Sequence, residues 1–211
     1  MNCTAIVLAA GQGKRMKIQK QFLLLKGKPV LFYSISCFEK SSEIDDIIIV
    51  TGAESVEYVK REIVEPFGFQ KVKAVVTGGK ERYDSVYEGL KACQNCDYVF
   101  IHDGARPFVT EEMIERGKKA VIAGGACVLG VPSKDTVKIT DEEGFVESTP
   151  KRARVWNIQT PQIFSYTEIY SAYQKAKQEG MQGITDDAMV VELMTDTKVK
   201  FIEGSYSNIK V

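Results

Sequence analysis

The sequence predicts an α/β fold with a doubly wound, mostly parallel sheet and helices on both of its faces. Two observations predict it. Short runs of β-branched and other apolar residues recur along the 211-residue chain, and amphipathic stretches separate one run from the next. Strands of a parallel sheet are buried on both faces and therefore read as continuous apolar runs. Strands that alternate with helices in this way are typical of a three-layer, Rossmann-like domain.

The expected elements follow one another along the chain. We expect strands at residues 4–9, 47–51, 72–77, 98–102 and 126–131, and a last strand at 199–202. Apolar residues at helical spacing predict helices at 30–38, 56–64, 85–90 and 113–122, and two more at about 165–177 and 186–194. The sequence has no internal repeat, low-complexity tract or linker, so we expect residues 1–211 to form a single domain.

The pattern changes after Pro132. Val137 and Ile139 alternate with polar residues, residues 141–144 (Asp-Glu-Glu-Gly) predict a turn, and Phe145 begins a second short strand. A basic segment at 151–154 comes next. We therefore expect an antiparallel β-arm, at about 133–157, inserted into the domain.

Composition excludes several classes of function. The chain carries 28 basic and 28 acidic residues, so a general attraction to nucleic acid or to an anionic membrane is not expected. No apolar run approaches the roughly 18 residues of a membrane span, and the first run lacks the flanks of a signal peptide. We therefore expect a cytoplasmic protein.

Five cysteines, an odd number spread along the chain, are typical of reduced thiols. Cys93 and Cys96 form a C-x-x-C, but a single pair without a second pair is weak support for a zinc or redox site. We expect these two to be surface thiols at the end of a helix.

A glycine turn directly follows the first expected strand. Gly11 and Gly13 allow the backbone to bend and to present N–H groups to an anion, at the edge of the sheet where ligands bind. Four cations follow within a few residues: Lys14, Arg15, Lys17 and Lys20. The turn matches neither a P-loop nor the dinucleotide-binding fingerprint. Taken alone, it is equally compatible with an ordinary strand–helix turn that carries solvated lysines.

Several motifs in a fixed order are more specific. They are Leu8-Ala-Ala-Gly-Gln-Gly-Lys-Arg-Met16, Lys20-Gln-Phe-Leu23, Gly27-Lys-Pro29, Gly78-Gly79, Arg82, Asp84-Ser-Val86, Gly89-Leu90, His102-Asp-Gly-Ala-Arg-Pro107, Asp135-Thr136 with Lys138, Trp156, Gln159-Thr-Pro-Gln162, Thr185-Asp-Asp-Ala188 and Asn208-Ile-Lys-Val211. Across essentially the whole chain, this series closely resembles the 2-C-methyl-D-erythritol 4-phosphate cytidylyltransferases of the non-mevalonate isoprenoid route.

Two alternatives stand beside this resemblance. Ribitol-5-phosphate cytidylyltransferases share the glycine turn and the Gln-Thr-Pro-Gln element, but Ala9-Ala10-Gly11 and Gly104-Ala105-Arg106 favour the erythritol family. The other alternative is a weakly active nucleotide-binding module.

The resemblance implies transfer of CMP from CTP to 2-C-methyl-D-erythritol 4-phosphate, with release of pyrophosphate. It implies that Arg15 and Lys20 stabilise the charge that develops around the α-phosphorus. The residues it assigns to the nucleotide are Ala9, Ala10, Gly11, Gly13, Gly79, Ser85, Asp103 and Ala105, with the cytosine at Gly79 and Ser85. The expected cofactor is Mg²⁺, bridged mainly by the CTP phosphates rather than held directly by protein side chains.

The acceptor has one phosphate and several hydroxyls, so it needs cations and polar side chains. The resemblance assigns to it Asp103, Arg106, Thr136, Arg152, Thr160, Thr185 and Lys210. Arg152 and Thr160 are expected to come from the arm of a partner subunit, which implies a homodimer with exchanged arms. Arg154 competes with Arg152, because in an extended segment both project from the same side. His102 is expected to be a packed or hydrogen-bonded residue rather than a proton carrier.

The sequence departs from the family pattern at two places. Residues 17–19 alone separate Met16 from Lys20, where relatives usually carry a longer stretch. The given sequence stops at Val211, where family members usually continue with a threonine and a helix.

Overall fold

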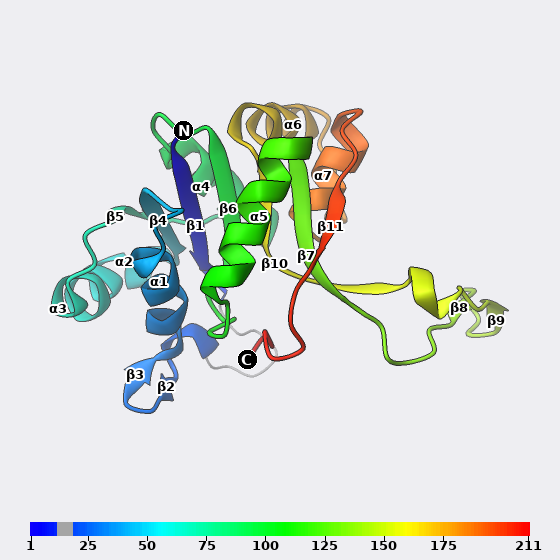
Figure 1. Ribbon diagram of the computed structural model, residues 1–211, viewed down its shortest axis with the longest axis horizontal. Coiled ribbons are helices and arrows are strands. Elements are labelled where there is room, and N and C mark those ends of the chain that lie inside the picture. Colours follow the sequence, from blue (N-terminus) through cyan, green and yellow to red (C-terminus); the bar gives the residue numbers. More distant parts are fainter. Residues whose placement is uncertain (12–18) are drawn as a thin grey trace.

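Figure 1 shows the computed structural model of the chain, which describes residues 1–11 and 19–211. Within these residues, seven strands form one sheet in the order β11-β7-β10-β6-β1-β4-β5. Their bounds are β1 (Cys3–Ala9), β4 (Asp46–Thr51), β5 (Val72–Thr77), β6 (Tyr98–Asp103), β7 (Ala126–Pro132), β10 (Trp156–Ser165) and β11 (Lys200–Glu203). All neighbours run parallel except β10, which is antiparallel to both β6 and β7. The predicted doubly wound, mostly parallel sheet is therefore confirmed.

Alternate residues of β1 show why its apolar run forms a strand with both faces buried. Cys3, Ala5 and Val7 contact the cluster on one face of the sheet, and Ile6 contacts the cluster on the other. Side chains of successive strand residues point to opposite faces, so a strand in the centre of the sheet needs apolar residues at every position.

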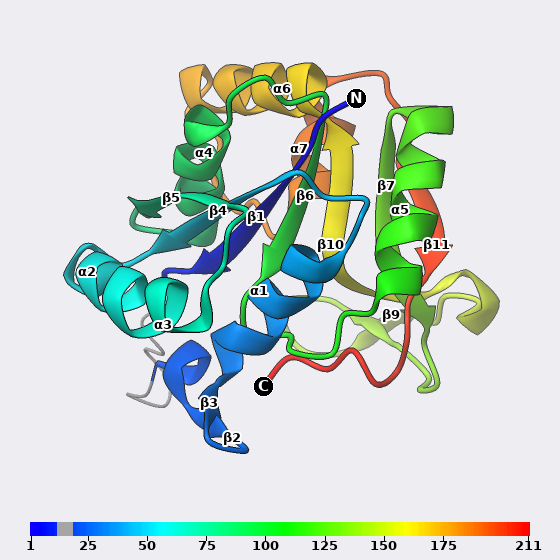
Figure 2. The same ribbon diagram turned by 60° about the vertical axis from the view of Figure 1, so that its left-hand side comes forward.

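Helices cover both faces of the sheet (Figure 2). One face is covered by α1 (Val30–Lys40), by a helical run made of η2 (Ala53–Ser55), α2 (Val56–Tyr58), the π-helical η3 (Val59–Val64) and α3 (Glu65–Phe67), and by α5 (Glu111–Gly124). The other face is covered by α4 (Arg82–Ala92), α6 (Tyr166–Gln178) and α7 (Asp187–Met194). The predicted helices are confirmed, and the run around residues 56–64 extends to Phe67 because Gly68, at φ +64°, ends it.

Strand β10 is the element that the sequence pattern did not predict. Its middle contains Gln159, Thr160 and Gln162, so it lacks the continuous apolar run of the other central strands. The pairing of β10 with β7 also shifts register between Ile158 and Gln162. Two small elements near the start of the chain were also not expected: the 3₁₀ turn η1 (Lys20–Phe22) and the hairpin of β2 (Leu24–Leu25) and β3 (Lys28–Pro29).

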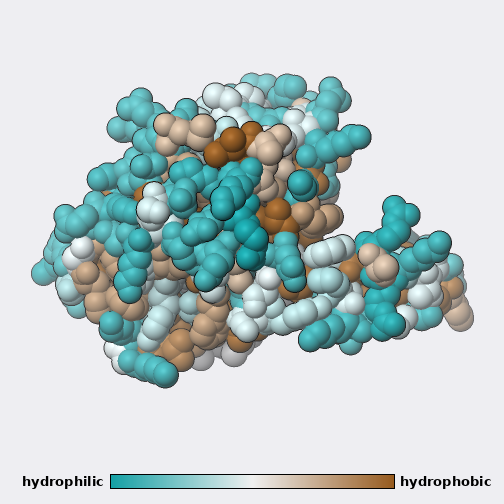
Figure 3. Space-filling model, in the orientation of Figure 1, coloured by the Kyte–Doolittle hydropathy of each residue, from teal (hydrophilic) through white to brown (hydrophobic). Residues whose placement is uncertain are grey.

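The arm leaves the body after β7 and returns into β10 (Figure 1). It contains the short hairpin of β8 (Ile139–Thr140) and β9 (Val146–Ser148), followed by the 3₁₀ turn η4 (Arg152–Arg154). The turn between the two strands is stabilised by Asp141, whose carboxylate accepts from the N–H of Phe145 at 2.8 Å. Figure 3 shows the arm standing clear of the body, and Phe145 is 68% exposed.

The C-x-x-C cysteines are not surface thiols, which corrects the expectation from the sequence. Cys93 and Cys96 are each 9% exposed and belong to the apolar cluster beneath α4. In the segment between α4 and β6, the Cys93 thiol donates to the carbonyl of Gly89 at 3.4 Å and the Cys96 thiol to the carbonyl of Tyr98 at 3.1 Å. None of the helices in the described ranges combines the length and the apolar character that crossing a membrane requires.

Candidate active site

The carboxyl ends of β1, β4, β5 and β6 lie at one edge of the sheet, because these strands run parallel. Asp103 ends β6 and lies opposite Leu8, one residue before the end of β1. Ligands of open α/β sheets bind at this edge. The motif residues that follow each strand therefore come together here.

Gln21 fixes the start of the glycine turn. Its buried amide donates to the carbonyl oxygens of Ala9 at 2.7 Å and Gly11 at 3.0 Å. The hydroxyl of Thr51, at the end of β4, also donates to Ala9 at 3.3 Å. Lys20 immediately precedes Gln21 in η1, so these contacts hold the backbone of Lys20 beside the turn.

Gly78 and Gly79, between β5 and α4, lie where side chains do not fit. A Cβ on Gly78 would meet the Cβ of Ala10 at 2.7 Å, and a Cβ on Gly79 would overlap with the first turn of α4. The Ser85 hydroxyl accepts from the N–H of Gly79 at 3.1 Å and donates to the carbonyl of Glu81 at 3.1 Å. Ala10, Gly79 and Ser85 are therefore neighbours, as a shared nucleotide site requires.

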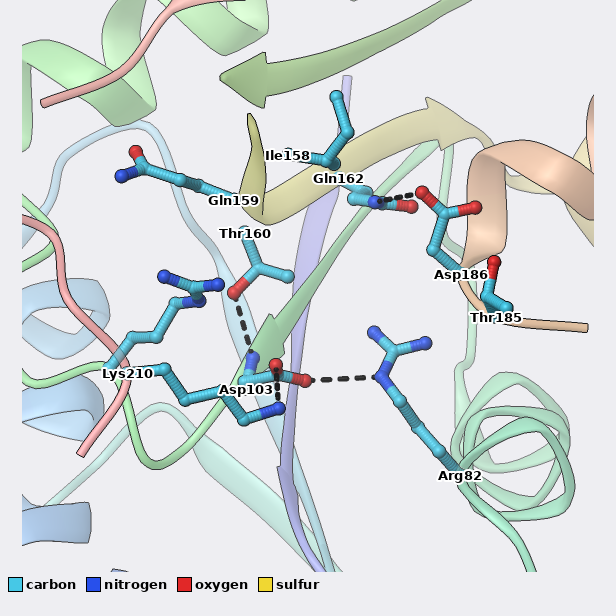
Figure 4. Close-up of a pocket in the computed structure, with 10 residues that line it drawn as sticks. Arg82, Asp103, Ile158, Gln159, Thr160, Gln162, Thr185, Asp186 and Lys210 are labelled. Carbon is cyan, nitrogen blue, oxygen red and sulfur yellow. Dashed lines mark hydrogen bonds and ion pairs between the residues drawn. The ribbon is translucent and has the colours of Figure 1, made fainter. Parts of the chain in front are cut away.

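Asp103 lies at the centre of a pocket beside this edge (Figure 4). Its carboxylate accepts from Arg82 Nε at 3.1 Å and from Lys210 Nζ at 2.6 Å. Burial alone would raise the pKa of Asp103, but the two cations outweigh burial and hold the pKa well below its ordinary value. Asp103 is therefore an ionised carboxylate at neutral pH.

Arg82 is fixed by a second carboxylate. Its guanidinium makes two parallel hydrogen bonds, of 3.0 and 2.8 Å, to the fully buried Asp187 at the start of α7. The Tyr173 hydroxyl donates to the same carboxylate at 2.6 Å. Burial opposes the charge of Arg82, but Asp187 and Asp103 more than offset it and raise the pKa of Arg82 well above its ordinary value. The paired geometry gives Arg82 one orientation, with Nε toward Asp103.

Thr160 joins the pocket from β10. Its hydroxyl oxygen accepts from the backbone N–H of Asp103 at 3.0 Å and lies 3.1 Å from Nδ1 of His102. The Nε2 atom of His102 lies 3.1 Å from the carbonyl oxygen of Arg106. His102 is completely buried, and burial lowers its pKa from 6.5 to about 4. The ring is therefore neutral at pH 7, in agreement with a hydrogen-bonded residue.

The C-terminal tail brings Lys210 to Asp103. Asn208 is fully buried, and its side-chain amide donates to the carbonyl oxygen of Thr160 at 3.0 Å. The backbone carbonyl of Asn208 accepts from Arg106 Nη1 at 2.8 Å. The N–H that follows Lys210 donates to the carbonyl oxygen of Ala105 at 2.9 Å. The tail is therefore attached to the pocket on both sides of Lys210.

The pocket has a volume of about 340 Å³. Its lining comprises Arg82, Asp103, Arg106, Ile158, Gln159, Thr160, Gln162, Thr185, Asp186 and Lys210. Within the described part of the chain, the buried Nε of Arg106 has no hydrogen-bond partner.

The structure brings five of the residues that the resemblance assigned to the acceptor into this pocket: Asp103, Arg106, Thr160, Thr185 and Lys210. The expectation that Thr160 comes from a partner's arm is wrong. In β10, Gln162 pairs with Ile101 of the same chain, and this register places Thr160 beside Asp103.

Arg152 and Thr136 do not reach the pocket within one chain. Both are exposed and lie on the arm, where Arg152 donates to the carbonyl of Lys134 at 3.3 Å. Arg152 and Arg154 lie in the 3₁₀ turn η4 rather than in an extended segment. With three residues per turn, their side chains point in different directions, so Arg154 does not compete for the same position.

The remaining assignments are Lys20, Ala105, Arg15 and Gly13. Lys20 lies in η1, outside the lining of the pocket, and Ala105 lies between Asp103 and Arg106 in the loop after β6. Arg15 and Gly13 lie outside the described residues. Among the residues that are described, no group of three His, Cys, Asp or Glu side chains could hold a metal ion by itself.

Sequence reasoning gave no role to Arg82, Gln162 and Asp187. All three belong to motifs of the resemblance, but their contacts join residues far apart in the sequence. Gln162 accepts from the backbone N–H groups of Asp187 at 3.0 Å and Ala188 at 2.9 Å, which fixes the start of α7. The one signal in the sequence was the pair of adjacent acids at 186–187, which precedes an apolar helix.

Comparisons with known proteins agree with this architecture. Residues 3–211 match the family described as 2-C-methyl-D-erythritol 4-phosphate cytidylyltransferase. The protein of that name from Lachnoclostridium phytofermentans is 50% identical over 210 residues, which cover 99% of this chain and 90% of the relative. Its counterpart from Clostridium kluyveri is 48% identical over 209 residues, with coverage of 98% and 90%.

Solved structures show the same relationship. The crystal structure of 4-diphosphocytidyl-2C-methyl-D-erythritol synthase from Anaerococcus prevotii gives a TM-score of 0.90 at 37% identity, covering 100% of this chain and 90% of that one. A Francisella tularensis 2-C-methyl-D-erythritol 4-phosphate cytidylyltransferase gives 0.83 at 28% identity, with coverage of 100% and 94%. Because the similarity extends through the whole sheet and the loops that form the pocket, the chain belongs to the 2-C-methyl-D-erythritol 4-phosphate cytidylyltransferase family.

Proposed function

We propose that the chain transfers CMP from CTP to 2-C-methyl-D-erythritol 4-phosphate, giving 4-diphosphocytidyl-2-C-methyl-D-erythritol and pyrophosphate. The observation that carries this proposal is the pocket around Asp103, which lies opposite Leu8 near the carboxyl end of β1. It offers the carboxylate of Asp103 for hydroxyl groups and the cationic side chain of Arg106 for an oxygen. Its volume suits a small polyol phosphate. We further propose that residues 1–211 act as one nucleotidyltransferase domain, with the arm at about 133–157 as an insertion.

In the reaction, an oxygen of the acceptor phosphate forms a bond to the α-phosphorus of CTP. The bond from that phosphorus to the β-phosphate oxygen breaks, and pyrophosphate leaves. The attacking phosphate is already anionic, so the protein needs to align the two groups rather than remove a proton. We propose that Arg15 and Lys20 stabilise the charge that develops on the α-phosphate oxygens. The contacts of Gln21 support the role of Lys20, because they attach its backbone to the start of the turn.

The nucleotide is proposed to lie along the edge formed by the ends of β1, β5 and β6. The backbone at Ala9, Ala10, Gly11 and Gly13 would face its phosphates, Gly79 and Ser85 its cytosine, and Asp103 with Ala105 its ribose. The packing of Gly78 against Ala10 supports this arrangement, because it brings the phosphate and base regions together.

The residues present fit a divalent metal that is shared with the substrate. Asp103 is an ionised carboxylate whose two oxygens retain lone pairs beside their bonds to Arg82 and Lys210. Magnesium is commonly held by one or two carboxylates together with substrate phosphates. When bound, Mg²⁺ would offset part of the triphosphate charge, and Asp103 is the residue that would hold it.

Charge balance supports a contribution from a second subunit. Among the residues that the structure describes, the three cations that line the pocket (Arg82, Arg106 and Lys210) are matched in number by three carboxylates in or behind it (Asp103, Asp186 and Asp187). A dianionic acceptor phosphate needs further cations, and Arg152 with Thr136 lies on an arm that stands clear of its own body. We propose a homodimer in which each arm places these two residues in the partner's pocket.

Pyrophosphate release tests the function directly. The chain is incubated with CTP and Mg²⁺, and each acceptor is offered separately. We expect release with 2-C-methyl-D-erythritol 4-phosphate and little with ribitol 5-phosphate. Release with ribitol 5-phosphate alone would show that the chain is a ribitol-phosphate enzyme. CTP binding without turnover on either acceptor would show a weakly active nucleotide-binding module.

A further inference from the structure

His102 is the single histidine of the chain, and its ring is held on three sides. Phe38 packs edge-on against it, with ring centroids 5.2 Å apart. Nε2 lies 3.1 Å from the carbonyl oxygen of Arg106, and Nδ1 lies 3.1 Å from the hydroxyl oxygen of Thr160. Neither His102 nor Phe38 is accessible to solvent. The ring therefore has one orientation. Each ring nitrogen has one hydrogen-bond partner at 3.1 Å, and the backbone of Thr160 also lies close to the ring.

These neighbours determine which ring nitrogen carries the proton. A carbonyl oxygen can only accept a hydrogen bond, so Nε2 must donate to Arg106. In a neutral imidazole the other nitrogen is then an acceptor. The Thr160 hydroxyl must consequently donate its single proton to Nδ1. The opposite tautomer would place two acceptors, Nε2 and the carbonyl oxygen, against each other at 3.1 Å.

The hydroxyl of Thr160 has then only acceptor capacity left. Its proton is used by His102, and one of its two lone pairs receives the backbone N–H of Asp103 at 3.0 Å. Within the described residues no other contact uses the second lone pair, and Thr160 lines the pocket (Figure 4), so we take this lone pair to be the one that a ligand meets. A hydroxyl group of a ligand can donate to this lone pair. An oxygen of an ionised phosphate has no proton to donate and would be repelled.

We infer that His102 is a positioning residue that locks the Thr160 hydroxyl as a hydrogen-bond acceptor, so that the pocket requires a donating hydroxyl of the acceptor substrate at this point. The same hydrogen bond between Thr160 and His102 also orients the substrate. The phosphate is directed away from Thr160, toward the cations, and the polyol end lies against β10. This inference rests on the proposed function, since it concerns how that acceptor is recognised.

The tautomer can be measured without turnover. With ¹⁵N-labelled histidine, a long-range ¹H–¹⁵N correlation spectrum shows a single imidazole, because the chain has one histidine. We expect a protonated Nε2 and a bare Nδ1 at pH 7. A protonated Nδ1, in either the neutral or the doubly protonated ring, would overturn the inference.

Kinetics test the requirement for a donating hydroxyl. The probes are three analogues of 2-C-methyl-D-erythritol 4-phosphate, each with one hydroxyl replaced by fluorine, which cannot donate. In the parent enzyme, one of them should raise the acceptor KM about tenfold or more, because a paired acceptor on the protein is left unmatched. In Thr160→Val, which removes the hydroxyl at nearly constant shape, that penalty should disappear. Thr160→Ser, the matched control, should keep it. Equal penalties in the parent and Thr160→Val at every position would overturn the inference.

Two His102 variants separate positioning from packing. His102→Gln can still donate to the Arg106 carbonyl but offers no acceptor to Thr160, so the fluorine penalty should shrink. His102→Asn places an amide oxygen nearer to Thr160 and should preserve the penalty better. A penalty unchanged by His102→Gln would contradict the proposed lock. Absence of turnover with the unmodified acceptor would contradict the proposed function instead, and the tautomer measurement would still decide the state of His102.

Discussion

The pocket and the arm differ in how their proposed substrate-binding residues are oriented. In the pocket, Asp103 contacts Arg82, Thr160 and Lys210, which come from three distant parts of the chain. On the arm, Arg152 contacts the carbonyl of Lys134 at 3.3 Å, and its side chain is exposed. Folding of one chain is therefore enough to orient the pocket. The side chains of the arm gain their orientation from whatever the arm meets, which we propose to be the partner subunit.

The largest effect should come from breaking the support behind the pocket. Asp187→Ala leaves Arg82 and the Tyr173 hydroxyl without their buried partner, so the free energy of unfolding should fall by about 4 kcal/mol. Urea denaturation measures this. Glu57→Gln is the matched control, since Glu57 pairs with Lys60 on the surface and is 75% exposed. It should cost at most about 0.5 kcal/mol. Similar losses in the two variants would contradict the distinction.

The second prediction concerns pH. Burial lowers the pKa of His102 from 6.5 to about 4, so between these values the unfolded chain binds a proton that the folded chain does not. As the pH falls from about 6.5 to about 4, this difference in proton binding should lower the free energy of unfolding by about 3 kcal/mol in total. Above pH 6.5, His102 should have no effect on how stability depends on pH. Asp103, whose pKa is lowered from 3.8, stabilises the folded chain throughout this range, and its contribution is lost mainly as the pH falls below about 4.

Denaturation of the parent and of His102→Gln at several values between pH 7 and pH 4 isolates this contribution. Carboxylates that titrate in both proteins cancel in the difference. We expect the stability of the parent to fall more steeply than that of the variant. Parallel curves would show that the His102 ring is not held neutral by its surroundings.

A third effect should appear on the arm. Arg152→Ala should raise the KM for the acceptor about 30-fold, because a charge-assisted contact to the phosphate is lost, while CTP affinity and unfolding stay unchanged. Arg154→Ala, the matched control, should have little effect. Steady-state kinetics with each substrate varied in turn measure both. An unchanged acceptor KM in Arg152→Ala would remove Arg152 from the site.

Mixing variants tests whether the site is shared between subunits. Arg152→Ala has a defective arm, and Arg15→Ala is proposed to have a defective body. In a mixed dimer, one of the two sites would combine the intact body with the intact arm. After equal mixing and exchange, activity should recover to about a quarter of the parent rate. No recovery, with mixed dimers verified, would argue against arm exchange.

The smallest effect on the single chain should come from the tip of the arm. Phe145 is 68% exposed, so Phe145→Ser should change the free energy of unfolding of one chain by less than about 0.5 kcal/mol. The same change should weaken the dimer, because the side chain is free to pack against a partner. Sedimentation over a range of concentrations measures association. Unaltered association would show that the apolar tip is not part of the interface.

Most of the sheet could be predicted because each of its strands has a recognisable pattern in its own short stretch of sequence. The apolar runs at 4–9, 47–51 and 126–131 are buried on both faces, and burial of that kind leaves a pattern within six or seven residues. Strand β10 could not be found in this way. Its polar residues are satisfied by partners elsewhere: Gln159 donates to the carbonyl of Ser205 at 2.7 Å, and Gln162 donates to Asp186 at 2.9 Å.

The features of the site can be separated in the same way, into those encoded by local sequence and those that depend on distant partners. The sequence by itself determined the strand–helix alternation and the presence of an arm, because backbone propensity and apolar periodicity act over short stretches of chain. Only the tertiary structure decided that Thr160 belongs to the pocket of its own chain, that Arg82 is held by Asp187, and that His102 directs the Thr160 hydroxyl. These contacts join residues that are 57 to 105 positions apart. They form only when β10 inserts between β6 and β7 and the first residue of α7, Asp187, meets the first residue of α4, Arg82.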